Sequence, residues 1–597
     1  MKKTGNINLL VSMGTCGLAA GAEPVCNALK KEIQRQNLQN NVTIIETGCM
    51  GLCYSEPTIE VIDNVSGKSI IYGNVKEEHA AAIISSGISK VPGIDIIKRN
   101  WYYPEEEDNI NKVLQAKIAL RNTGRINPEK IQDYLNKSGY SALKKALTEM
   151  TSQDVIDEII KSGLRGRGGG GFPTGKKWSF AAAQKTDVKY IICNADEGDP
   201  GAFMDRAVLE GDPHAVLEAM VIAGYAINAN KGFIYIRAEY PLAIKRLQIA
   251  INQATDKGFL GNNIFESDFN FDIEIKYGAG AFVCGEETAL ICSIEGQRGM
   301  PTYKPPFPAI AGLWQKPTIV NNVETFANIG AIIRKGADWF RRIGTESSPG
   351  TKVFALAGKI NKVGLVEVPM GTTLKDIIYN IGGGITNDKK LKAVQTGGPS
   401  GGCITTDYLD TPIDYDSLKE LGTMMGSGGM IVMDEDNCMV DIAKFFLDFT
   451  VDESCGKCTP CRVGGKQMHK ILDRITEGKG EPADLILLHD LANTIKTASL
   501  CGLGMTAPNP VLSTLRYFED EYKEHIFDKK CRSGKCTNLI VYTIDSEKCV
   551  GCTLCAKACP AKCISGKVKE IHSINQKQCI KCGQCLSTCK FNAIKTS

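Results

Sequence analysis

Eight cysteines near the C-terminus follow the spacing that holds iron–sulfur clusters. They form two runs of one pattern: Cys549, Cys552, Cys555 and Cys559, then Cys579, Cys582, Cys585 and Cys589. Three cysteines spaced by two residues, with a fourth three residues further on, suit [4Fe-4S] ligation. Zinc sites pair Cys-x2-Cys units at longer separation, so a zinc ribbon or a disulfide knot is the less favoured interpretation. The sequence therefore predicts chemistry that moves single electrons.

In two-cluster ferredoxins the fourth cysteine of each run binds the other cluster. We therefore expect one [4Fe-4S] cluster on Cys549, Cys552, Cys555 and Cys589. The second cluster is expected on Cys579, Cys582, Cys585 and Cys559. Pro560 follows the first run, as in that pattern, and the lack of a proline after Cys589 removes nothing essential.

A third [4Fe-4S] site is predicted upstream. Cys455, Cys458 and Cys461 form Cys-x2-Cys-x2-Cys, which can bind three irons of a cubane cluster. The fourth iron needs a distant ligand, and Cys501, which follows a helical stretch, is the obvious supplier. A zinc site is the alternative interpretation.

Four cysteines in the N-terminal region could hold a [2Fe-2S] cluster. Cys49 and Cys53 are separated by three residues, and Cys16 and Cys26 precede them. The alternative is that one or more are buried thiols, because the spacing from Cys16 to Cys26 is loose. The pattern resembles that of thioredoxin-like ferredoxins, in which a loosely spaced pair precedes Cys-x3-Cys, and this resemblance favours the cluster.

A zinc site is a further hypothesis. His525, Cys531 and Cys536 precede the ferredoxin domain, and Cys563 is a ninth cysteine within it. One histidine and three thiolates satisfy a closed tetrahedral zinc site. Unmetallated thiols are the alternative, and His469 or His489 could replace His525. The remaining cysteines lack ligand spacing and are interpreted as packing residues: Cys193, Cys284, Cys292, Cys403 and Cys438.

A glycine-rich segment offers a phosphate site. It contains Gly166, Arg167, Gly168, Gly169, Gly170 and Gly171. Its G-x-G-x-x-G pattern alone is weak, and a helical stretch (155–162) precedes it where a dinucleotide fingerprint needs a strand. Bare backbone N–H groups beside Arg167 and Lys177 would still hold a phosphate, whereas a flexible surface loop is the alternative. Other polar segments suit the same ligand: 193–200, 278–288, 304–308 and 321–325.

With these motifs in order, residues 110–520 closely resemble the NADH-oxidising flavin subunit of respiratory complex I. The resemblance implies FMN and NADH in one cavity and electron transfer to a [4Fe-4S] cluster. It also implies a Rossmann-like FMN domain, a ubiquitin-like β-grasp domain and a helical bundle. Hydride would pass between nicotinamide and flavin without a catalytic acid or base, because the chemistry belongs to the cofactor.

The resemblance also implies binding residues. The glycine loop and Lys177 would lie against FMN, with further flavin contacts from Asn194, Asp196, Gly285, Glu286, Asn321, Asn322 and Thr325. The nicotinamide nucleotide would contact Phe172, Phe180, Glu287, Lys304 and Phe307. Without the resemblance, these phenylalanines would be interpreted as core residues. Glu197 joins the candidates, as do Asp199 and Phe282, where the family often has glutamate and tyrosine.

The two end domains resemble those of the β subunits of trimeric electron-bifurcating [FeFe]-hydrogenases from anaerobic bacteria. This implies a hetero-oligomer with a hydrogenase catalytic subunit and a small thioredoxin-like [2Fe-2S] subunit, and exchange of electrons with ferredoxin. The alternatives are the NAD(P)-linked flavin subunit of a formate dehydrogenase or of a non-bifurcating hydrogenase, a freestanding NADH:ferredoxin oxidoreductase, and a scaffold with an inactive flavin site. No residue decides between NAD(H) and NADP(H).

Composition is compatible with this interpretation. A formal charge of +3 points to neither nucleic acid nor membrane, and no run of about 18 apolar residues exists, so no membrane span is expected. Metal-bound thiolates need a reducing compartment, so 24 cysteines with short ligand spacings predict a cytoplasmic protein.

A chain of 597 residues is too long for one core. We expect a multidomain α/β and α+β protein: a thioredoxin-like [2Fe-2S] domain (1–95), a linker with helices (96–140), an FMN/NAD(H)-binding domain (141–335), a ubiquitin-like β-grasp domain (336–435), a helical bundle with a [4Fe-4S] cluster (436–525), a candidate zinc-linked connector (526–545) and a ferredoxin domain with two [4Fe-4S] clusters (546–597). Within this part, the segment from Trp101 to Asp108, with its proline and acidic run, is expected to be a linker.

Overall fold

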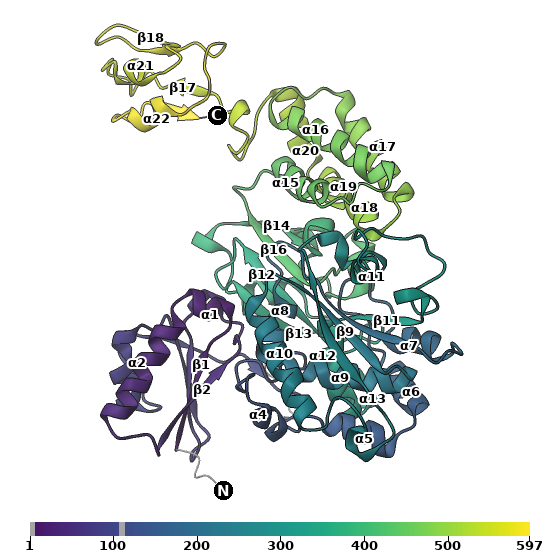
Figure 1. Ribbon diagram of the computed structural model, residues 1–597. Helices are drawn as coiled ribbons and strands as arrows, with labels where there is room; N and C mark the ends of the chain where they lie inside the picture. The colour runs from purple at the N-terminus through teal and green to yellow at the C-terminus, as the bar shows by residue number, and fades with distance from the viewer. Residues whose placement is uncertain (1–5, 107–113, 597) are drawn as a thin grey trace. The chain divides into compact units, whose positions relative to one another are not determined.

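The computed structural model describes residues 6–106 and 114–596. The chain divides into two compact units, Met1–Lys389 with Val394–Val432 and Lys390–Ala393 with Met433–Ser597. Figure 1 colours both units by residue number. No described helix combines the length and apolar character needed to cross a membrane.

A mixed sheet with strand order β2-β1-β3-β4-β5 opens the first unit. Its elements are β1 (Ile7–Ser12), α1 (Thr15–Ala19), α2 (Ala22–Arg35), β2 (Val42–Thr47), β3 (Ile59–Asp63), β4 (Ser69–Gly73), α3 (Ala80–Ser86) and β5 (Asp95–Ile97). β1 runs parallel to β2 and antiparallel to β3. Because side chains alternate along a strand, Leu9 packs in the core that contains Leu29 of α2, whereas Leu10 packs with Trp101 and Tyr103. Both faces of this sheet are therefore covered.

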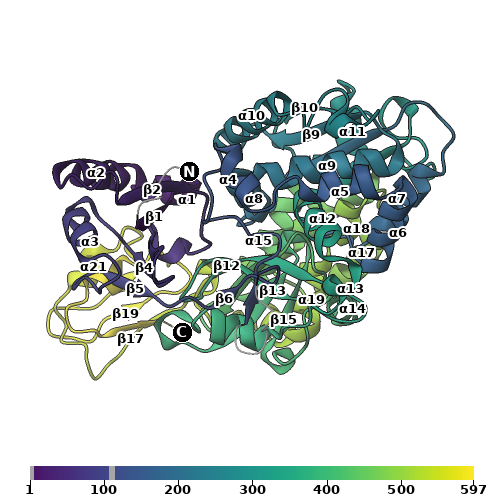
Figure 2. The same ribbon diagram turned by 90° about the horizontal axis from the view of Figure 1, so that it is seen from below.

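The segment expected to be a linker from Trp101 onward is packed against the protein at its start. Trp101, Tyr102 and Tyr103 are buried, and β6 (Trp101–Tyr102) pairs in parallel with β7 (Gln115–Ala116). Figure 2 shows β6 close to β13 of a later sheet. Asp108, at the end of the expected linker, lies outside the described residues.

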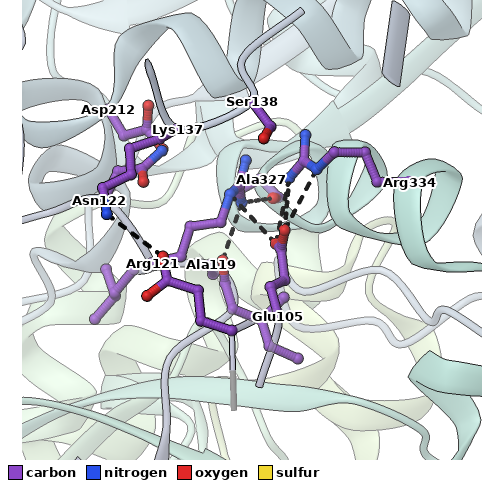
Figure 3. A network of polar contacts seen from close by, with 12 residues as sticks. Glu105, Ala119, Arg121, Asn122, Lys137, Ser138, Asp212, Ala327 and Arg334 are labelled. Carbon is purple, nitrogen blue, oxygen red and sulfur yellow. Dashed lines mark hydrogen bonds and ion pairs between the residues drawn. The ribbon is translucent and has the colours of Figure 1, made fainter. Parts of the chain in front are cut away.

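An ion-pair network holds the end of this segment. The Glu105 carboxylate lies 3.0 Å from Arg334 Nη2 and 3.5 Å from Arg121 Nε. Figure 3 shows this carboxylate in contact with both guanidinium groups. Asn122 donates a hydrogen bond of 2.8 Å to the buried Asp212 carboxylate beside it. Glu105 thus attaches the end of the segment to the domain that follows it.

A four-stranded sheet with order β10-β9-β8-β11 forms the centre of the first unit. Its domain contains α4 (Ile131–Asn136), α5 (Ser141–Glu149), α6 (Ser152–Ser162), α7 (Thr174–Ala182), β8 (Tyr190–Ala195), α8 (Met204–Gly211), α9 (Pro213–Ile227), β9 (Lys231–Arg237), α10 (Pro241–Asp256), β10 (Asp272–Gly278), α11 (Glu287–Ile294), β11 (Thr318–Asn322), α12 (Val323–Lys335) and α13 (Ala337–Arg341). All three strand pairings are parallel. The strands are short apolar runs, as a sheet covered on both faces requires, and α9 is buried along nearly its whole length.

A third sheet has the order β13-β12-β16-β14-β15. It is built from β12 (Thr351–Gly358), β13 (Gly364–Pro369), β14 (Leu391–Thr396), β15 (Gly402–Thr405) and β16 (Gly429–Asp434), with α14 (Tyr415–Glu420) after β15. β13 contacts the earlier segment, because the Glu367 carboxylate accepts hydrogen bonds from the backbone N–H groups of Ile118, Ala119 and Leu120 at 2.8–2.9 Å.

The second unit begins with helices: α15 (Met439–Asp452), α16 (Gly465–Thr476), α17 (Ala483–Ala498), α18 (Gly502–Thr506), α19 (Asn509–Tyr517) and α20 (Glu519–Lys523). Val440, Leu447, Met468 and Leu472 form part of their shared core, at the spacing of an amphipathic helix face. The unit ends with β17 (Tyr542–Ile544), α21 (Leu554–Ala558), β18 (Ile564–Ser565), β19 (Ser573–Ile574), α22 (Gln584–Thr588) and β20 (Ile594–Thr596).

Candidate functional site

The glycine loop joins the end of α6 to the start of α7. The Gly166 N–H donates to the Phe172 carbonyl at 2.9 Å, which closes the loop. Gly169 and Gly171 have φ angles of 122° and 62°, a region that favours glycine. A Cβ atom on Gly170 would meet no atom within 4 Å, so the loop presents bare backbone to open space. Such a loop can accept the phosphate of a flavin nucleotide.

Tyr415 and Arg165 hold the two ends of this loop. The Tyr415 hydroxyl donates to the Gly166 carbonyl at 2.7 Å, and Arg165 Nε donates to the Gly171 carbonyl at 2.8 Å. The Arg165 guanidinium also lies over the Tyr415 ring, 4.5 Å from its centroid. Tyr415 begins α14, so the third domain of the first unit supports the loop. Nothing in the local sequence of the loop indicates this partner.

The position of Arg167 corrects the expectation that its side chain binds phosphate. The side chain is fully buried, and its guanidinium donates to the carbonyls of Arg165, Pro349 and Thr351 at 2.7–3.0 Å. The Arg167 N–H donates to Thr325 Oγ1 at 2.8 Å. Arg167 and Thr325 therefore fix the base of the loop.

Polar side chains gather at the carboxyl ends of β8 and β11. These strands are neighbours, with Asn322 opposite Asn194. Asn194 Nδ2 donates to the Gly285 carbonyl at 2.8 Å, and Trp178 Nε1 donates to Asn321 Oδ1 at 2.9 Å. A Cβ atom on Gly168 would lie 3.0 Å from Asn322 Cβ, so the glycine loop reaches the same edge. Ligands of open parallel sheets bind at this edge.

Four charged residues form one chain beside this edge. Lys177 Nζ lies 2.9 Å from Glu287 Oε2, and Lys304 Nζ lies 2.7 Å from Glu286 Oε1 and 2.8 Å from Glu287 Oε1. Burial would raise the pKa of Glu287, but the ammonium groups of Lys177 and Lys304 lower it to about 2. Glu287 is therefore ionised at neutral pH. The four side chains, which are predicted to contact the flavin or the nucleotide, thus hold one another in place through their ion pairs.

The three phenylalanines assigned to nucleotide stacking are not core residues. Phe172, Phe180 and Phe307 are 50%, 44% and 54% exposed, so the interpretation as packing residues is wrong. Exposed aromatic rings can stack on the aromatic ring of a nucleotide. Phe282 lies close to Gly198, where a Cβ atom would meet its Cδ2 at 2.7 Å.

Two acidic candidates are occupied by protein contacts. Glu197 accepts hydrogen bonds from the backbone N–H groups of Asp205 and Arg206 at 3.0 and 3.1 Å, so it caps the start of α8. Glu197 therefore has a structural role, and its contact with a cofactor stays a prediction. Asp199 accepts a hydrogen bond from Ser427, and burial raises its pKa to about 6. Asp205, which the sequence did not single out, accepts a hydrogen bond from Asn322.

The second unit brings together the cysteines of the upstream [4Fe-4S] prediction. Cys461 lies on a π-helical turn (Pro460–Gly464), and Cys501 is the N-cap of α18. Burial raises the pKa of Cys461, and the neighbouring charges of Cys458, Cys501 and Cys455 raise it further. Gly504 allows close packing, since a Cβ atom there would lie 3.2 Å from Cys461 Cβ. Three thiols near that of Cys461 are compatible with a cubane cluster.

The C-terminal domain contains two cavities lined by cysteines. The first is lined by Cys549, Cys552, Cys555 and Cys589. The second is lined by Cys559, Cys579, Cys582 and Cys585. Each cavity takes three cysteines from one run and the fourth from the other, the exchange that the spacing predicts.

A buried group of metal-binding side chains lies near the start of α15. Cys438, His525, Cys531 and Cys536 place their ligand atoms within 4.8 Å of one another. The Cys438 and Cys536 sulfurs are 3.8 Å apart, which is about the S···S edge of a tetrahedron with Zn–S bonds of about 2.3 Å. His525 Nε2 lies 3.3 Å from each of these sulfurs, and Nδ1 lies 2.7 Å from the Glu521 carbonyl. That contact fixes the ring as it does in zinc sites.

This arrangement corrects the expected ligand set. Cys438, interpreted from the sequence as a packing residue, takes the place expected for Cys563. Cys563 instead lies beside the second ferredoxin cavity, with its sulfur 3.4 Å from Cys559 Sγ. His469 pairs with Asp448 and Asp473, and His489 contacts Asn493, so neither replaces His525.

The N-terminal cysteines are only partly brought together. The hydrogen bond from Cys53, aided by the Arg206 guanidinium, lowers the pKa of Cys16 to about 6 against the effect of burial. Cys53 also contacts Cys49. Cys26 has other partners: its sulfur lies 3.8 Å from Glu46 Oε1, and burial and that carboxylate raise its pKa to about 11. Cys53 therefore contacts both Cys16 and Cys49, whereas Cys26 has Glu46 as its neighbour.

Four family profiles match the chain. They are the Nuo51 FMN-binding domain (residues 159–331), the SLBB domain (353–404), the NADH-ubiquinone oxidoreductase-F iron-sulfur binding region (441–525) and the 4Fe-4S dicluster domain (541–590). These ranges cover the glycine loop, part of the third sheet, the Cys461 site and most of the paired cavities.

Curated relatives and solved structures agree with these profiles. The chain is 64% identical over 480 residues to the NADP-reducing hydrogenase subunit HndC of Solidesulfovibrio fructosivorans, covering 80% of this chain and 98% of the relative. It is 44% identical to an NADH-quinone oxidoreductase subunit of Rhizobium meliloti, covering 69% and 98%. A crystal structure of an NAD+-reducing [NiFe]-hydrogenase in the H2-reduced state matches with a TM-score of 0.61 and 29% identity, over 87% of this chain and 84% of the other.

Proposed function

Because this chain belongs to the family of NADH-quinone oxidoreductase flavin subunits and related hydrogenase flavin subunits, we propose that it is the flavin subunit of an electron-bifurcating hydrogenase. It is an NAD(P)H-linked flavin and iron–sulfur oxidoreductase subunit. In this proposal it exchanges hydride between NAD(H) and FMN, and single electrons pass through its clusters to or from ferredoxin and a hydrogenase subunit.

One observation carries the flavin site. The bare glycine loop, the carboxyl ends of β8 and β11 and the turn at Gly285 converge on one edge of a parallel sheet. Bound FMN would supply both hydride and single-electron chemistry there. The loop N–H groups would hold the phosphate, and Asn194 and Asn322 would orient the flavin.

The nucleotide would lie on the exposed side of the same edge. Phe172, Phe180 and Phe307 offer faces for its rings, and Lys304 offers a cation that Glu286 and Glu287 hold in place. The protein contributes orientation and exclusion of water rather than a proton donor, because hydride transfer needs none.

We propose that the chain binds three [4Fe-4S] clusters, one [2Fe-2S] cluster and one zinc ion. The Cys461 site and the two C-terminal cavities support the first three. Cys16, Cys49 and Cys53 support the [2Fe-2S] cluster, with Cys26 as the proposed fourth ligand. Cys438, His525, Cys531 and Cys536 support the zinc site.

The ligand assignment in the N-terminal domain has a direct test. Cys26→Ala and Cys16→Ala variants of the full chain should both lose the EPR signal of the reduced [2Fe-2S] cluster. If only Cys16→Ala loses it, Cys26 is a packing thiol and the fourth ligand is another group. Total iron in each variant reports whether the [4Fe-4S] clusters stay intact.

The proposed partners are a hydrogenase catalytic subunit and a small thioredoxin-like [2Fe-2S] subunit, in a hetero-oligomer located in the cytoplasm. The relative HndC, at 64% identity, is a hydrogenase subunit, which favours this over the formate dehydrogenase alternative. The 24 free cysteines support a reducing compartment. Anaerobic affinity purification tests the partner, since copurification of a molybdenum or tungsten formate dehydrogenase would reject the hydrogenase assignment.

Activity tests examine the enzyme assignment and the bifurcation assignment separately. The purified chain should contain FMN and reduce a viologen dye with NADH or NADPH, and a chain that lacks FMN and reduces no dye contradicts the enzyme assignment. In the assembled complex, bifurcation predicts that H2 forms only when reduced nucleotide and reduced ferredoxin are both supplied. If H2 forms from either donor alone, bifurcation is rejected and the complex is a non-bifurcating hydrogenase.

A further inference from the structure

The two cavities of the C-terminal domain are related by an internal repeat of 30 residues. Cys549, Cys552 and Cys555 of the first cavity correspond to Cys579, Cys582 and Cys585 of the second. α21 (Leu554–Ala558) and α22 (Gln584–Thr588) have the same relation. Equivalent lining positions can therefore be compared directly, and any difference between them distinguishes the environments of the two clusters.

Two differences that involve a side-chain nitrogen or sulfur atom stand out among these positions. The first cavity is lined by His572, whereas the equivalent residue of the second cavity is Tyr542. Conversely, the second cavity is lined by Cys563, whereas the first has Ala593. Each cavity thus has a nitrogen or sulfur group, beyond its four cysteines, that the other lacks.

The His572 ring is buried and held in place by its neighbours. It is 3% exposed, and its Nδ1 lies 3.1 Å from the Glu570 carbonyl oxygen. Gly566 packs against the ring, where a Cβ atom would lie 2.6 Å from His572 Cγ. The buried Nε2 atom has no hydrogen-bond partner in the part of the chain that the structure describes. A buried polar atom without a partner is costly, so its presence at the wall of a cavity needs an explanation.

We propose that His572 donates a hydrogen bond from Nε2 to the sulfur atoms of the first cluster and makes it easier to reduce than the second. This inference rests on the proposed [4Fe-4S] clusters. Cluster sulfurs accept hydrogen bonds, and Nε2 is the buried ring nitrogen at this cavity that lacks a partner among the described residues, so Nε2 is assigned as their donor.

The direction of the effect follows from charge. Reduction adds one electron, and therefore one negative charge, to the cluster, so a hydrogen-bond donor beside the sulfurs stabilises the reduced form more than the oxidised form. The second cavity has Tyr542 in place of the imidazole at the equivalent position. The thiol of Cys563, 3.4 Å from Cys559 Sγ, is a weak donor and acts less strongly.

The test is an EPR-monitored redox titration of the full chain. His572→Phe should weaken reduction of one ferredoxin cluster about tenfold, which is about 59 mV for one electron. His572→Gln keeps a side-chain N–H donor and should recover part of the shift. Cys563→Ala creates the residue of the other cavity and should shift the second cluster by less. Tyr542→Phe is the matched control, expected to leave the first cluster unchanged.

Iron content distinguishes failure of the proposed clusters from failure of the proposed role of His572. If the native chain contains no iron for these clusters, the proposed function fails. If iron and EPR spin counts are native and His572→Phe moves no midpoint, the role of His572 is rejected. Should His572→Phe lose its cluster, the same titration of His572→Gln and a 15N-histidine ENDOR coupling to the reduced native cluster decide the matter. Absence of that coupling also overturns the inference.

Discussion

The hydroxyl of Tyr415 lies 2.7 Å from the carbonyl oxygen of Gly166, so a residue 249 positions away in the chain fixes the start of the glycine loop. Arg165 completes the support at the other end through Gly171. The loop itself has six residues and five glycines, which leaves its own conformation poorly defined. Its shape therefore depends on the domain that contains α14.

Removal of this hydroxyl should weaken flavin binding. In Tyr415→Phe the ring still packs beneath Arg165, but the Gly166 carbonyl loses its donor. A lost neutral hydrogen bond costs about 1 kcal/mol, which corresponds to roughly fivefold weaker FMN binding. Fluorescence titration of FMN into the flavin-free protein measures the dissociation constant. Tyr379→Phe, at a 42% exposed ring, is the control, and equal affinities in all three proteins would contradict the supporting role.

The Glu105 ion pairs should fasten the N-terminal domain. Glu105, Arg121 and Arg334 have side chains that are 15%, 7% and 12% exposed, so Glu105→Gln removes the carboxylate that these two largely buried cations share. Arg334 keeps the more distant carboxylate of Glu218, at 3.8 Å. We expect a loss of about 3 kcal/mol in stability and faster proteolysis before residue 114. Glu106→Gln is the neighbouring control, because Glu106 is 44% exposed and should cost less than about 1 kcal/mol. Similar effects for both variants would show that burial of Glu105 contributes nothing.

A pH effect is expected from Asp212 in the same network. Burial raises its pKa to about 6 despite Arg121 and the hydrogen bond from Asn122. The unfolded value is about 3.9, so the protonated form is favoured by folding, and this stabilisation is complete below about pH 4 and lost as the pH rises through 6. Between pH 5 and pH 7 the native chain should lose about 1 kcal/mol relative to Asp212→Asn. Urea unfolding followed by FMN fluorescence measures both proteins, and parallel pH curves would refute the assignment.

The cluster sites were accessible to sequence reasoning because their ligand spacings are local. Cys455, Cys458 and Cys461 lie within seven residues, and the runs around Cys555 and Cys585 repeat a known pattern. In the C-terminal domain each cavity is lined by three cysteines of one run and one of the other. The family resemblance is confirmed by relatives that cover most of the chain, and with it the character of the chain as a flavin and iron–sulfur oxidoreductase subunit.

Other features depend on long-range packing that no local pattern encodes. Arg167 was expected to bind phosphate, but Pro349 and Thr351 supply carbonyls that bury its guanidinium. The Trp101 segment was expected to be a linker because it is acidic, yet Glu105 within it faces Arg334, far along the chain. Arg167 was therefore assigned to a ligand, and Glu105 to a linker. Both assignments failed because the residues that contact these side chains are distant in sequence.

The proposed zinc ligand Cys438 is another residue whose partners are distant in sequence. It lies 87 residues before His525, has no neighbouring cysteine or histidine and contacts His525 Nε2 at 3.3 Å. Cys438→Ser should abolish bound zinc, because a structural site needs four ligands, while the iron content stays native. Cys563→Ser is the matched control, since Cys563 lies beside the second ferredoxin cavity instead, and it should keep its zinc. Metal analysis of both anaerobically purified variants decides between the two cysteines, and zinc retained in Cys438→Ser but lost in Cys563→Ser would restore the ligand set expected from the sequence.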